Sequence, residues 1–323
     1  MICPVAVASE LSAFGRSGRF GVSPWQEVPL VPSRLRRVVD PAQIPGRAAP
    51  DPQPDRGGFP PVMIMTMNPE KGDGGGPAPF DGAYYRDVFK VDSLRRWSIP
   101  WWSNRYYARL AGRLLRQNGG TRLIDVGCGQ GHLLTQLAPG VDAWGVEVSE
   151  YAVSRCAIFA PSARVILGNI ENGVPEGIPG AGFDVVVARY LFEHLADPGA
   201  AIARCASLLR PGGYLLFAVP NTSSPGRRLK GDRWFALLDE THCSLLDPPL
   251  WKKLVGDSGL ATEKIFSDGL WDVPYVRGVP KVLQYVVFSL PTILAVLLVS
   301  TALPLSWGEN LIGIARKPIV EPP

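Results

Sequence analysis

The sequence has few of the residues that build metal centres or disulfide frameworks. It contains three histidines, His132, His194 and His242, and no two of them lie four residues apart. Its five cysteines include no C-x-x-C pair, and their odd number excludes complete pairing within one chain. We therefore expect no bound metal and a reducing compartment.

A strong charge of either sign is also missing. The net charge is +4 over 323 residues, and the arginines are spread along the chain without an evident row on one helix. This composition gives no support to a nucleic-acid partner. No secretory signal core is evident near the start, so we expect a cytoplasmic protein, at the membrane face if it contacts lipid. Apolar residues make up 46% of the chain, enough for a sizeable core.

The most informative stretch that is present runs from Arg122 to Gly131. Its first half is apolar and ends in an acid, which predicts a buried parallel strand. The three glycines of its second half permit a turn with positive φ and a close approach of a ligand to the backbone. The leucines of 133–137 predict a helix whose N-terminal amides face that ligand. A ligand carrying a nucleoside is implied, with candidate contacts at Asp125, Gly127, Cys128, Gly129 and Gly131.

Strand and helix patterns alternate after this turn, which predicts an α/β fold with a parallel sheet. The expected strands after the first are 141–148, 163–168, 183–190, 214–219, 261–267 and 310–315, and the expected helices are 151–159, 197–209 and 248–257.

Glu147 ends the second expected strand, about twenty residues after Gly127. A carboxylate at this position can accept hydrogen bonds from both ribose hydroxyls. The same argument applies to NAD, but the dinucleotide motif needs its third glycine at position 132, where this chain has His132. The spacing therefore favours a different nucleoside.

Three motifs in order resemble those of class I S-adenosylmethionine-dependent methyltransferases: Asp125 to Gly131, Phe183 to Pro198, and Leu208 to Leu216. The resemblance covers roughly residues 100 to 318. It implies a Rossmann-like, doubly wound, seven-stranded sheet that is mostly parallel with an antiparallel last strand, and S-adenosyl-L-methionine as cofactor. It also implies methyl transfer to a small acceptor.

In that family the glycine loop passes the methionine part of the cofactor and the acid after strand two holds the ribose. The resemblance implies these roles for Gly127 to Gly131 and for Glu147, and places Asn169 and Ile170 beside the adenine. Many relatives carry Asp where this chain has Asn169. Arg189, in the second motif, is the remaining candidate cofactor contact.

Two histidines are candidate catalytic residues, because a hydroxyl or carbon-acid acceptor must lose a proton and histidine titrates near neutral pH. His242 lies in the long connection after strand five, where relatives of this family place acceptor-binding residues. His194 follows Glu193 in the second motif and is either catalytic or a packing residue beside the cofactor. The alternatives to a methyltransferase are a membrane-attached cofactor-binding module without turnover and a nicotinamide-dependent oxidoreductase.

The chain divides by composition into five parts. Residues 1–80 are rich in Pro, Gly and Arg and are either disordered or precede a later start. Residues 81–120 form an aromatic helical segment that packs on the sheet or caps the substrate mouth, and residues 121–281 form the core, with a mobile lid at 221–246. Residues 282–305 form a hydrophobic insertion, and residues 306–323 hold the last strand and tail.

The insertion at 282–305 carries no charge and is long enough, as a helix, to cross the roughly 30 Å hydrocarbon layer. A single crossing would separate the last two strands, which the resemblance pairs in one sheet. We therefore expect a helical hairpin bent at Pro291 or an interfacial helix, and a lipid-like acceptor. A buried helix pair or a dimer interface is the alternative. The oligomeric state is not predicted.

Overall fold

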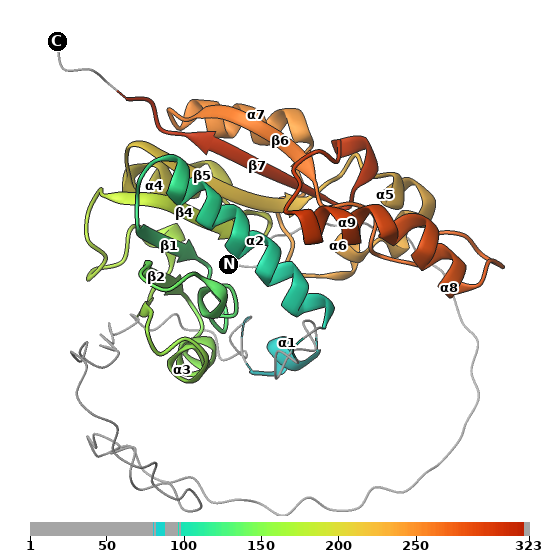
Figure 1. The fold of residues 1–323 in the computed structure, drawn as a ribbon, viewed down its shortest axis with the longest axis horizontal. Helices are drawn as coiled ribbons and strands as arrows, with labels where there is room; N and C mark the ends of the chain where they lie inside the picture. Colours follow the sequence, from blue (N-terminus) through green and yellow to red (C-terminus); the bar gives the residue numbers. More distant parts are fainter. Residues whose placement is uncertain (1–79, 81, 88–95, 97, 320–323) are drawn as a thin grey trace, which may run out of the picture. The chain divides into compact units, whose positions relative to one another are not determined.

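The computed structural model describes residues 80, 82–87, 96 and 98–319, all within one compact unit, Pro60–Pro323. The prediction for residues 1–80 therefore falls outside the described residues, except at Phe80. Figure 1 shows a central twisted sheet with helices on both sides.

The sheet has seven strands in the order β3-β2-β1-β4-β5-β7-β6, with β7 antiparallel to both neighbours and the other pairs parallel. This confirms the predicted Rossmann-like sheet. The central strands are apolar on both faces because helices cover both sides. The strands are β1 (Arg122–Val126), β2 (Asp142–Glu147), β3 (Arg164–Leu167), β4 (Phe183–Arg189), β5 (Leu209–Pro220), β6 (Ala261–Ser267) and β7 (Asn310–Arg316).

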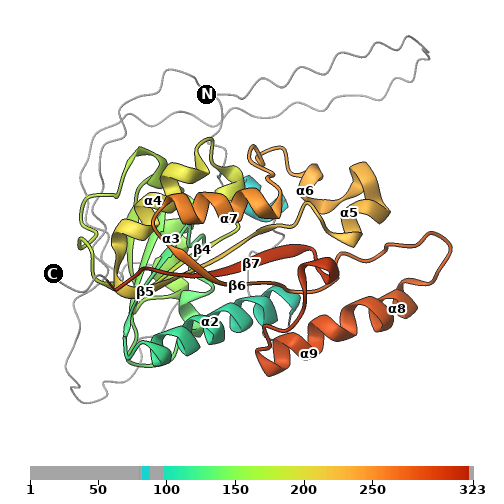
Figure 2. The same ribbon diagram turned by 90° about the horizontal axis from the view of Figure 1, so that it is seen from above.

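Two layers of helices enclose the sheet (Figure 2). One face is covered by α2 (Ile99–Gln117), α3 (Glu150–Phe159) and α9 (Leu290–Leu298), and the other by α4 (Pro198–Leu208) and α7 (Pro248–Asp257). Aromatic and leucine side chains of α2 are buried against the strands, so this part of the aromatic segment is a packing helix. The shorter helices are α1 (Gly82–Asp87), η3 (Ile170–Asn172), η4 (Phe192–His194) and η7 (Leu305–Trp307).

The helix predicted directly after the glycine turn is wrong. The structure has only a single 3₁₀ turn there, η2 (Leu134–Gln136). Pro139 follows and Gly140 takes a φ of +87°, so the chain turns away before an α-helix can extend. The amides that face a ligand at this end of the sheet therefore belong to the turn itself rather than to a long helix.

The hydrophobic insertion is one helical segment rather than a hairpin. It consists of α8 (Lys281–Gln284), a π-helical stretch η6 (Tyr285–Ser289) and α9. Pro291 comes just after the π-helical stretch, and the helix continues through it to Leu298 without a reversal of the chain. The hairpin prediction is wrong for this reason, while an interfacial helix and a dimer interface are both compatible with the exposed apolar side chains of this segment.

The connection predicted to be a mobile lid contains α5 (Pro225–Lys230), η5 (Gly231–Arg233) and α6 (Phe235–Leu238). Trp234 within it is fully buried, and its indole nitrogen donates a 2.7 Å hydrogen bond to Glu309. The segment is therefore anchored in its middle. Its closure over an acceptor stays a prediction.

Candidate active site

The glycine turn after β1 has the backbone that the sequence predicts. Gly127, Gly129 and Gly131 have φ values of +75°, +54° and +78°, which L side chains rarely adopt. A Cβ on Gly127 would lie 3.0 Å from Leu191 Cδ1, and one on Gly131 would lie 3.0 Å from Cys156 Sγ. The backbone conformation therefore favours glycine at all three positions, and the space for a side chain is tight at Gly127 and Gly131.

Glu147 ends β2 and lies against this turn. Its Oε2 accepts a 2.8 Å hydrogen bond from the Gly129 N–H, and its Oε1 accepts a 3.0 Å bond from the Ser149 N–H. Burial raises the pKa of the Glu147 carboxyl, and these backbone donors oppose the shift. The carboxylate thus fixes the turn and keeps acceptor capacity for further donors such as ribose hydroxyls.

Tyr85 on α1 is a contact that the sequence did not single out. Its hydroxyl lies 3.5 Å from Glu147 Oε1, and its ring carbon Cε1 lies 3.7 Å from the place of a Cβ on Gly129. The sequence signal for this contact was the high content of aromatic residues in the 81–120 segment, which predicted either packing on the sheet or a cap over the substrate mouth. In the structure α2 packs on the sheet while α1 lies over the glycine turn.

Asp125 of β1 and Arg189 of β4 are two ionisable residues of the candidate site. Asp125 is 2% exposed, and burial raises its pKa to about 7 while the Arg189 guanidinium opposes the shift. Arg189 Nη2 donates a 2.6 Å hydrogen bond to Asn104 Oδ1 of α2, and its guanidinium lies 4.9 Å from the centre of the Tyr107 ring. Arg189 is therefore held towards α2, and its contact with a cofactor stays a prediction.

Asn169, Ile170 and Cys128 occupy the remaining predicted positions. Asn169 begins η3, and its Oδ1 accepts a 2.8 Å hydrogen bond from the Glu171 N–H. Its amide oxygen already accepts this local hydrogen bond. It therefore has less capacity left for the predicted hydrogen bond from an adenine amine. Ile170 is buried, and Cys128 Sγ lies 2.8 Å from the place of a Cβ on Gly145, so the turn packs directly on β2.

Glu147→Ala is expected to weaken binding of S-adenosylmethionine by roughly 1–3 kcal/mol, since a charge-assisted hydrogen bond and the support of the turn are both lost. Calorimetric titration measures this. Glu150→Ala, a change of the same type at an exposed position of α3, serves as the control. An unchanged affinity of the Glu147 variant would remove this residue from the site.

The third histidine, His132, gives a pH prediction. Burial lowers its pKa to about 4, and Arg189 and Arg155 act in the same direction. Above pH 6.5 neither the folded nor the unfolded chain protonates it, but below this value only the unfolded chain takes up the proton, so stability falls as the pH falls towards 4. His132→Gln should remove up to about 2 kcal/mol of the stability difference between pH 7 and pH 5, at ~1.4 kcal/mol per pKa unit. Urea unfolding of both proteins at the two pH values measures this, and an identical difference would contradict it.

His194 and His242 come together from distant parts of the chain. His194 ends η4 and His242 lies after α6, yet their ring centres are 4.6 Å apart. His242 Nδ1 lies 2.7 Å from the Ala236 carbonyl, which can only accept, so this nitrogen carries the proton and Nε2 has the lone pair. Burial lowers the pKa of His194 to about 4, with His242 acting in the same direction, so His194 is neutral at physiological pH.

Glu193 is a further member of this group that the sequence did not predict as functional. It is 1% exposed, burial raises its pKa to about 8, and neither carboxyl oxygen has a hydrogen-bond partner among the described residues. Its ligand atoms and those of the two histidines all lie within 4.8 Å of one another, close enough to hold a metal ion. The expectation of no metal followed from sequence spacing, which does not show such a cluster.

Helix α1 contacts both the Glu147 part of the site and the segment that carries His242. Tyr85 contacts Glu147 as described, while the hydroxyl of the adjacent Tyr84 lies 3.4 Å from Asp239 Oδ2, in the segment that carries His242. One dipeptide therefore contacts Glu147 on one side and Asp239, three residues before His242, on the other. Neither Tyr84 nor Asp239 was predicted as a site residue.

The fold and this site define a class I S-adenosylmethionine-dependent methyltransferase domain. A family model described as methyltransferase domain matches residues 101–265, slightly more than half of the chain. The chain therefore belongs to this family, with S-adenosyl-L-methionine as methyl donor, and the family match does not support the nicotinamide-dependent oxidoreductase.

Curated relatives share part of their length with this chain. A ubiquinone biosynthesis O-methyltransferase of Rhodopseudomonas palustris is 34% identical over 137 residues, which cover 42% of this chain and 53% of that protein. One of Thiobacillus denitrificans is 27% identical over 190 residues, covering 56% of this chain and 76% of that protein. The chain thus spans about half the length of the first of these relatives.

Among solved structures, the plantazolicin methyltransferase BpumL in complex with a monoazolic desmethylPZN analog and SAH has a TM-score of 0.50 and 14% sequence identity. The alignment covers 73% of this chain and 93% of that one. At this identity the similarity shows the fold alone.

The residues present fit S-adenosylmethionine. The three glycines leave the turn without Cβ atoms, and Glu147 offers a buried carboxylate directly beside Gly129. Gly127 to Gly131 would hold the methionine part and Glu147 the ribose. These roles remain predictions, and the Glu147→Ala variant above tests that of Glu147.

Proposed function

We propose that this protein transfers a methyl group from S-adenosylmethionine to a hydroxyl of a small, apolar or lipid-like acceptor. The observation that carries the proposal is that adjacent tyrosines of α1 contact both Glu147 and Asp239, and Asp239 lies in the segment that carries His242. The similarity to ubiquinone biosynthesis O-methyltransferases supports an oxygen acceptor.

The cofactor, when bound, supplies an electrophilic methyl group on a sulfonium, and the protein aligns the acceptor and excludes water. The acceptor hydroxyl must lose its proton. Because Nδ1 of His242 carries a proton towards Ala236, its Nε2 is the atom that can accept a second one. Asp239 Oδ2 lies 3.8 Å from this Nε2 and would stabilise the resulting imidazolium.

Incubation of the full chain with isotopically labelled S-adenosylmethionine and a lipid extract of the source cells, followed by mass spectrometry, tests the proposal. A labelled apolar product is expected. Binding of S-adenosylhomocysteine without any methylated product would favour the cofactor-binding module without turnover. Tighter binding of NAD than of S-adenosylhomocysteine would overturn the proposal.

We also propose that the protein contacts the cytoplasmic face of a membrane through α8 to α9. Lys281–Leu298 is long and apolar enough, by length and composition, to cross a membrane, with a mean hydropathy of 1.8. A single crossing conflicts with the pairing of β6 and β7, which precede and follow it. Its apolar side chains are nevertheless exposed, among them Val282 at 75% and Leu298 at 73%. These observations favour a helix lying in the membrane interface.

A row of arginines accompanies this helix, and it corrects the view that the arginines are merely spread along the chain. Arg105, Arg109, Arg113 and Arg116 follow one face of α2, which has no acidic residue, and α2 contacts α9. None of the four forms a salt bridge with a described residue.

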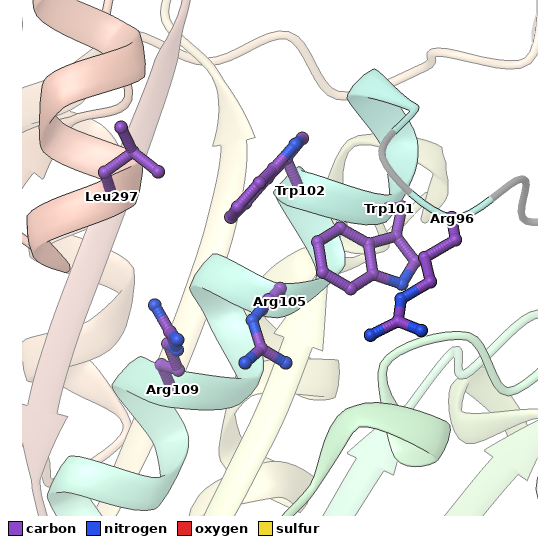
Figure 3. Close-up of a pocket in the computed structure, with 6 residues that line it drawn as sticks. All are labelled: Arg96, Trp101, Trp102, Arg105, Arg109 and Leu297. Atoms are coloured by element: carbon purple, nitrogen blue, oxygen red, sulfur yellow. The ribbon is translucent and has the colours of Figure 1, made fainter.

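The arginine row borders two hollows, of about 280 Å³ and 500 Å³. Figure 3 shows the smaller one, with Leu297 of α9 across from Trp102 and with Arg105 and Arg109 on the α2 side. Positive side chains next to an exposed apolar helix match the phosphates and acyl chains of anionic phospholipids.

Flotation with vesicles of neutral or anionic phospholipid tests the membrane proposal. We expect stronger binding to anionic vesicles, loss of binding to both in Leu283→Ser/Leu294→Ser, and loss of the anionic preference when Arg105, Arg109 and Arg113 are changed to Gln. Each basic residue near the surface contributes ~1 kcal/mol. Ile158→Ser, an equally exposed apolar residue on α3, is the control. A protein that binds neither vesicle and forms a stable dimer would overturn the proposal in favour of a subunit interface.

A further inference from the structure

We propose that Glu193, His194 and His242 bind one divalent transition-metal ion of the Zn²⁺ class. The inference deepens the proposed function, because it names a second cofactor for the acceptor half of the same site. Two imidazole nitrogens and one carboxylate oxygen form a ligand set that zinc accepts in sites with open positions, whereas Mg²⁺ prefers an all-oxygen shell.

The ligand atoms are already grouped. They lie within 4.8 Å of one another, and two atoms bound to one tetrahedral zinc at ~2.1 Å are separated by about 3.4 Å. Small side-chain rotations therefore bring them into range. Glu193 can rotate without losing a hydrogen bond, since neither of its oxygens has a partner among the described residues.

Both histidines use Nδ1 in a hydrogen bond outside the cluster, which leaves the same nitrogen, Nε2, as the candidate ligand atom. The Thr241 hydroxyl donates a 2.5 Å hydrogen bond to Asp239 Oδ1, so it accepts from His194 Nδ1, which lies 2.8 Å away. His242 Nδ1 donates to the Ala236 carbonyl at 2.7 Å. The Nε2 lone pair of each ring is thus available, and each Nδ1–H has the outer partner that is typical of metal-binding histidines.

The backbone holds the two segments in register. The Glu193 carbonyl accepts hydrogen bonds from the N–H groups of both Cys243 and Ser244, at 2.9 Å each. Glu193 and His194 on η4 are therefore fixed against the residues next to His242. Phe80 covers the cluster from the side of α1, with its ring centre 5.7 Å from that of His194. The buried, unpartnered carboxylate is the observation that distinguishes this cluster from a packed histidine pair.

An ion bound by three protein ligands would keep an open coordination position. An acceptor oxygen entering such a position would be more acidic than in water. The ion would thereby assist the same deprotonation for which His242 was proposed, and the histidines would act as its ligands.

Titration of chelator-treated full chain with Zn²⁺ by calorimetry, and with Co²⁺ by visible absorption, tests the proposal without any methyl acceptor. We expect one ion per chain and the intense Co²⁺ bands of a low-coordinate nitrogen and oxygen site. Glu193→Gln, His194→Gln and His242→Gln should each weaken binding by at least about 100-fold, and Thr241→Val by about 10-fold. Mg²⁺ should not compete.

Two controls have matched chemistry. His132→Gln removes the histidine outside the cluster, and Cys243→Ser removes the exposed cysteine next to His242. Both should bind Zn²⁺ as the unchanged protein does. Absence of stoichiometric binding by the unchanged protein would overturn the proposal, as would binding that survives in all three ligand variants or is lost equally in the controls. Metal binding without methyl transfer would sink the proposed function and leave the metal site standing.

Discussion

His242→Ala is expected to lower turnover by about 10² to 10⁴-fold, the usual contribution of a positioned acid–base group, while leaving the affinity for S-adenosylmethionine unchanged. The reason is geometric. The proposed base is the Nε2 of His242, whereas the predicted cofactor contacts are the glycine turn and Glu147, on the Tyr85 side of α1.

Single-turnover kinetics with labelled cofactor measures the loss, and calorimetry measures the affinity. Cys243→Ser, at the neighbouring exposed position, is the matched control and should turn over normally. Partial recovery of the His242 variant by added imidazole would distinguish loss of chemistry from loss of packing. Full activity of His242→Ala at every pH would make this residue structural.

Glu309→Ala is expected to cost about 3–5 kcal/mol of folding stability, because it leaves several buried donors without their acceptor. Glu309 is fully buried. Its Oε2 accepts from Ser224 Oγ at 2.8 Å and from Trp234 Nε1 at 2.7 Å, and its Oε1 accepts from Tyr275 Oη at 2.5 Å. The residue thus ties the 221–246 connection and the segment before α8 to the start of β7.

Urea unfolding measures this loss, with Glu263→Ala as a control at an exposed position on the adjacent strand β6. Limited proteolysis should show earlier cleavage within 221–246 in the Glu309 variant, since that segment loses its central anchor. An unfolding midpoint equal to that of the control variant would contradict the prediction.

The strands and the cofactor turn were predictable from sequence because their causes are local. A short apolar run such as 183–189 must be a buried strand when both its faces are apolar, and glycines at 127, 129 and 131 relieve a steric restriction that belongs to each residue alone. The order of these motifs then indicated the family, which the family match confirms, and the sheet order and the antiparallel β7 confirm the predicted fold.

Features that depend on later residues of the chain or on neighbouring elements were less well predicted. The leucines at 133–137 have helical spacing, but the turn at Pro139 and Gly140 leaves room for a single 3₁₀ turn. Pro291 suggested a hairpin, yet the helix continues through it, just after the π-helical stretch 285–289. Gln284 lies in an apolar run, and only the fold shows its buried side chain bonded to the backbone of Tyr275 and Val276.

The sequence by itself determined the class of fold, the glycine turn, the acid at Glu147 and the presence of an apolar insertion. Each of these features depends on residues that are close together along the chain. Only the tertiary structure decided which side chains meet. Glu193 and His242 are far apart in sequence, and the arginines of α2 and the apolar face of α9 are farther still. Their proximity results from sheet order and from which helices share a face. Spacing along the chain does not encode such neighbours, so the histidine cluster and the arginine row became visible only in the fold.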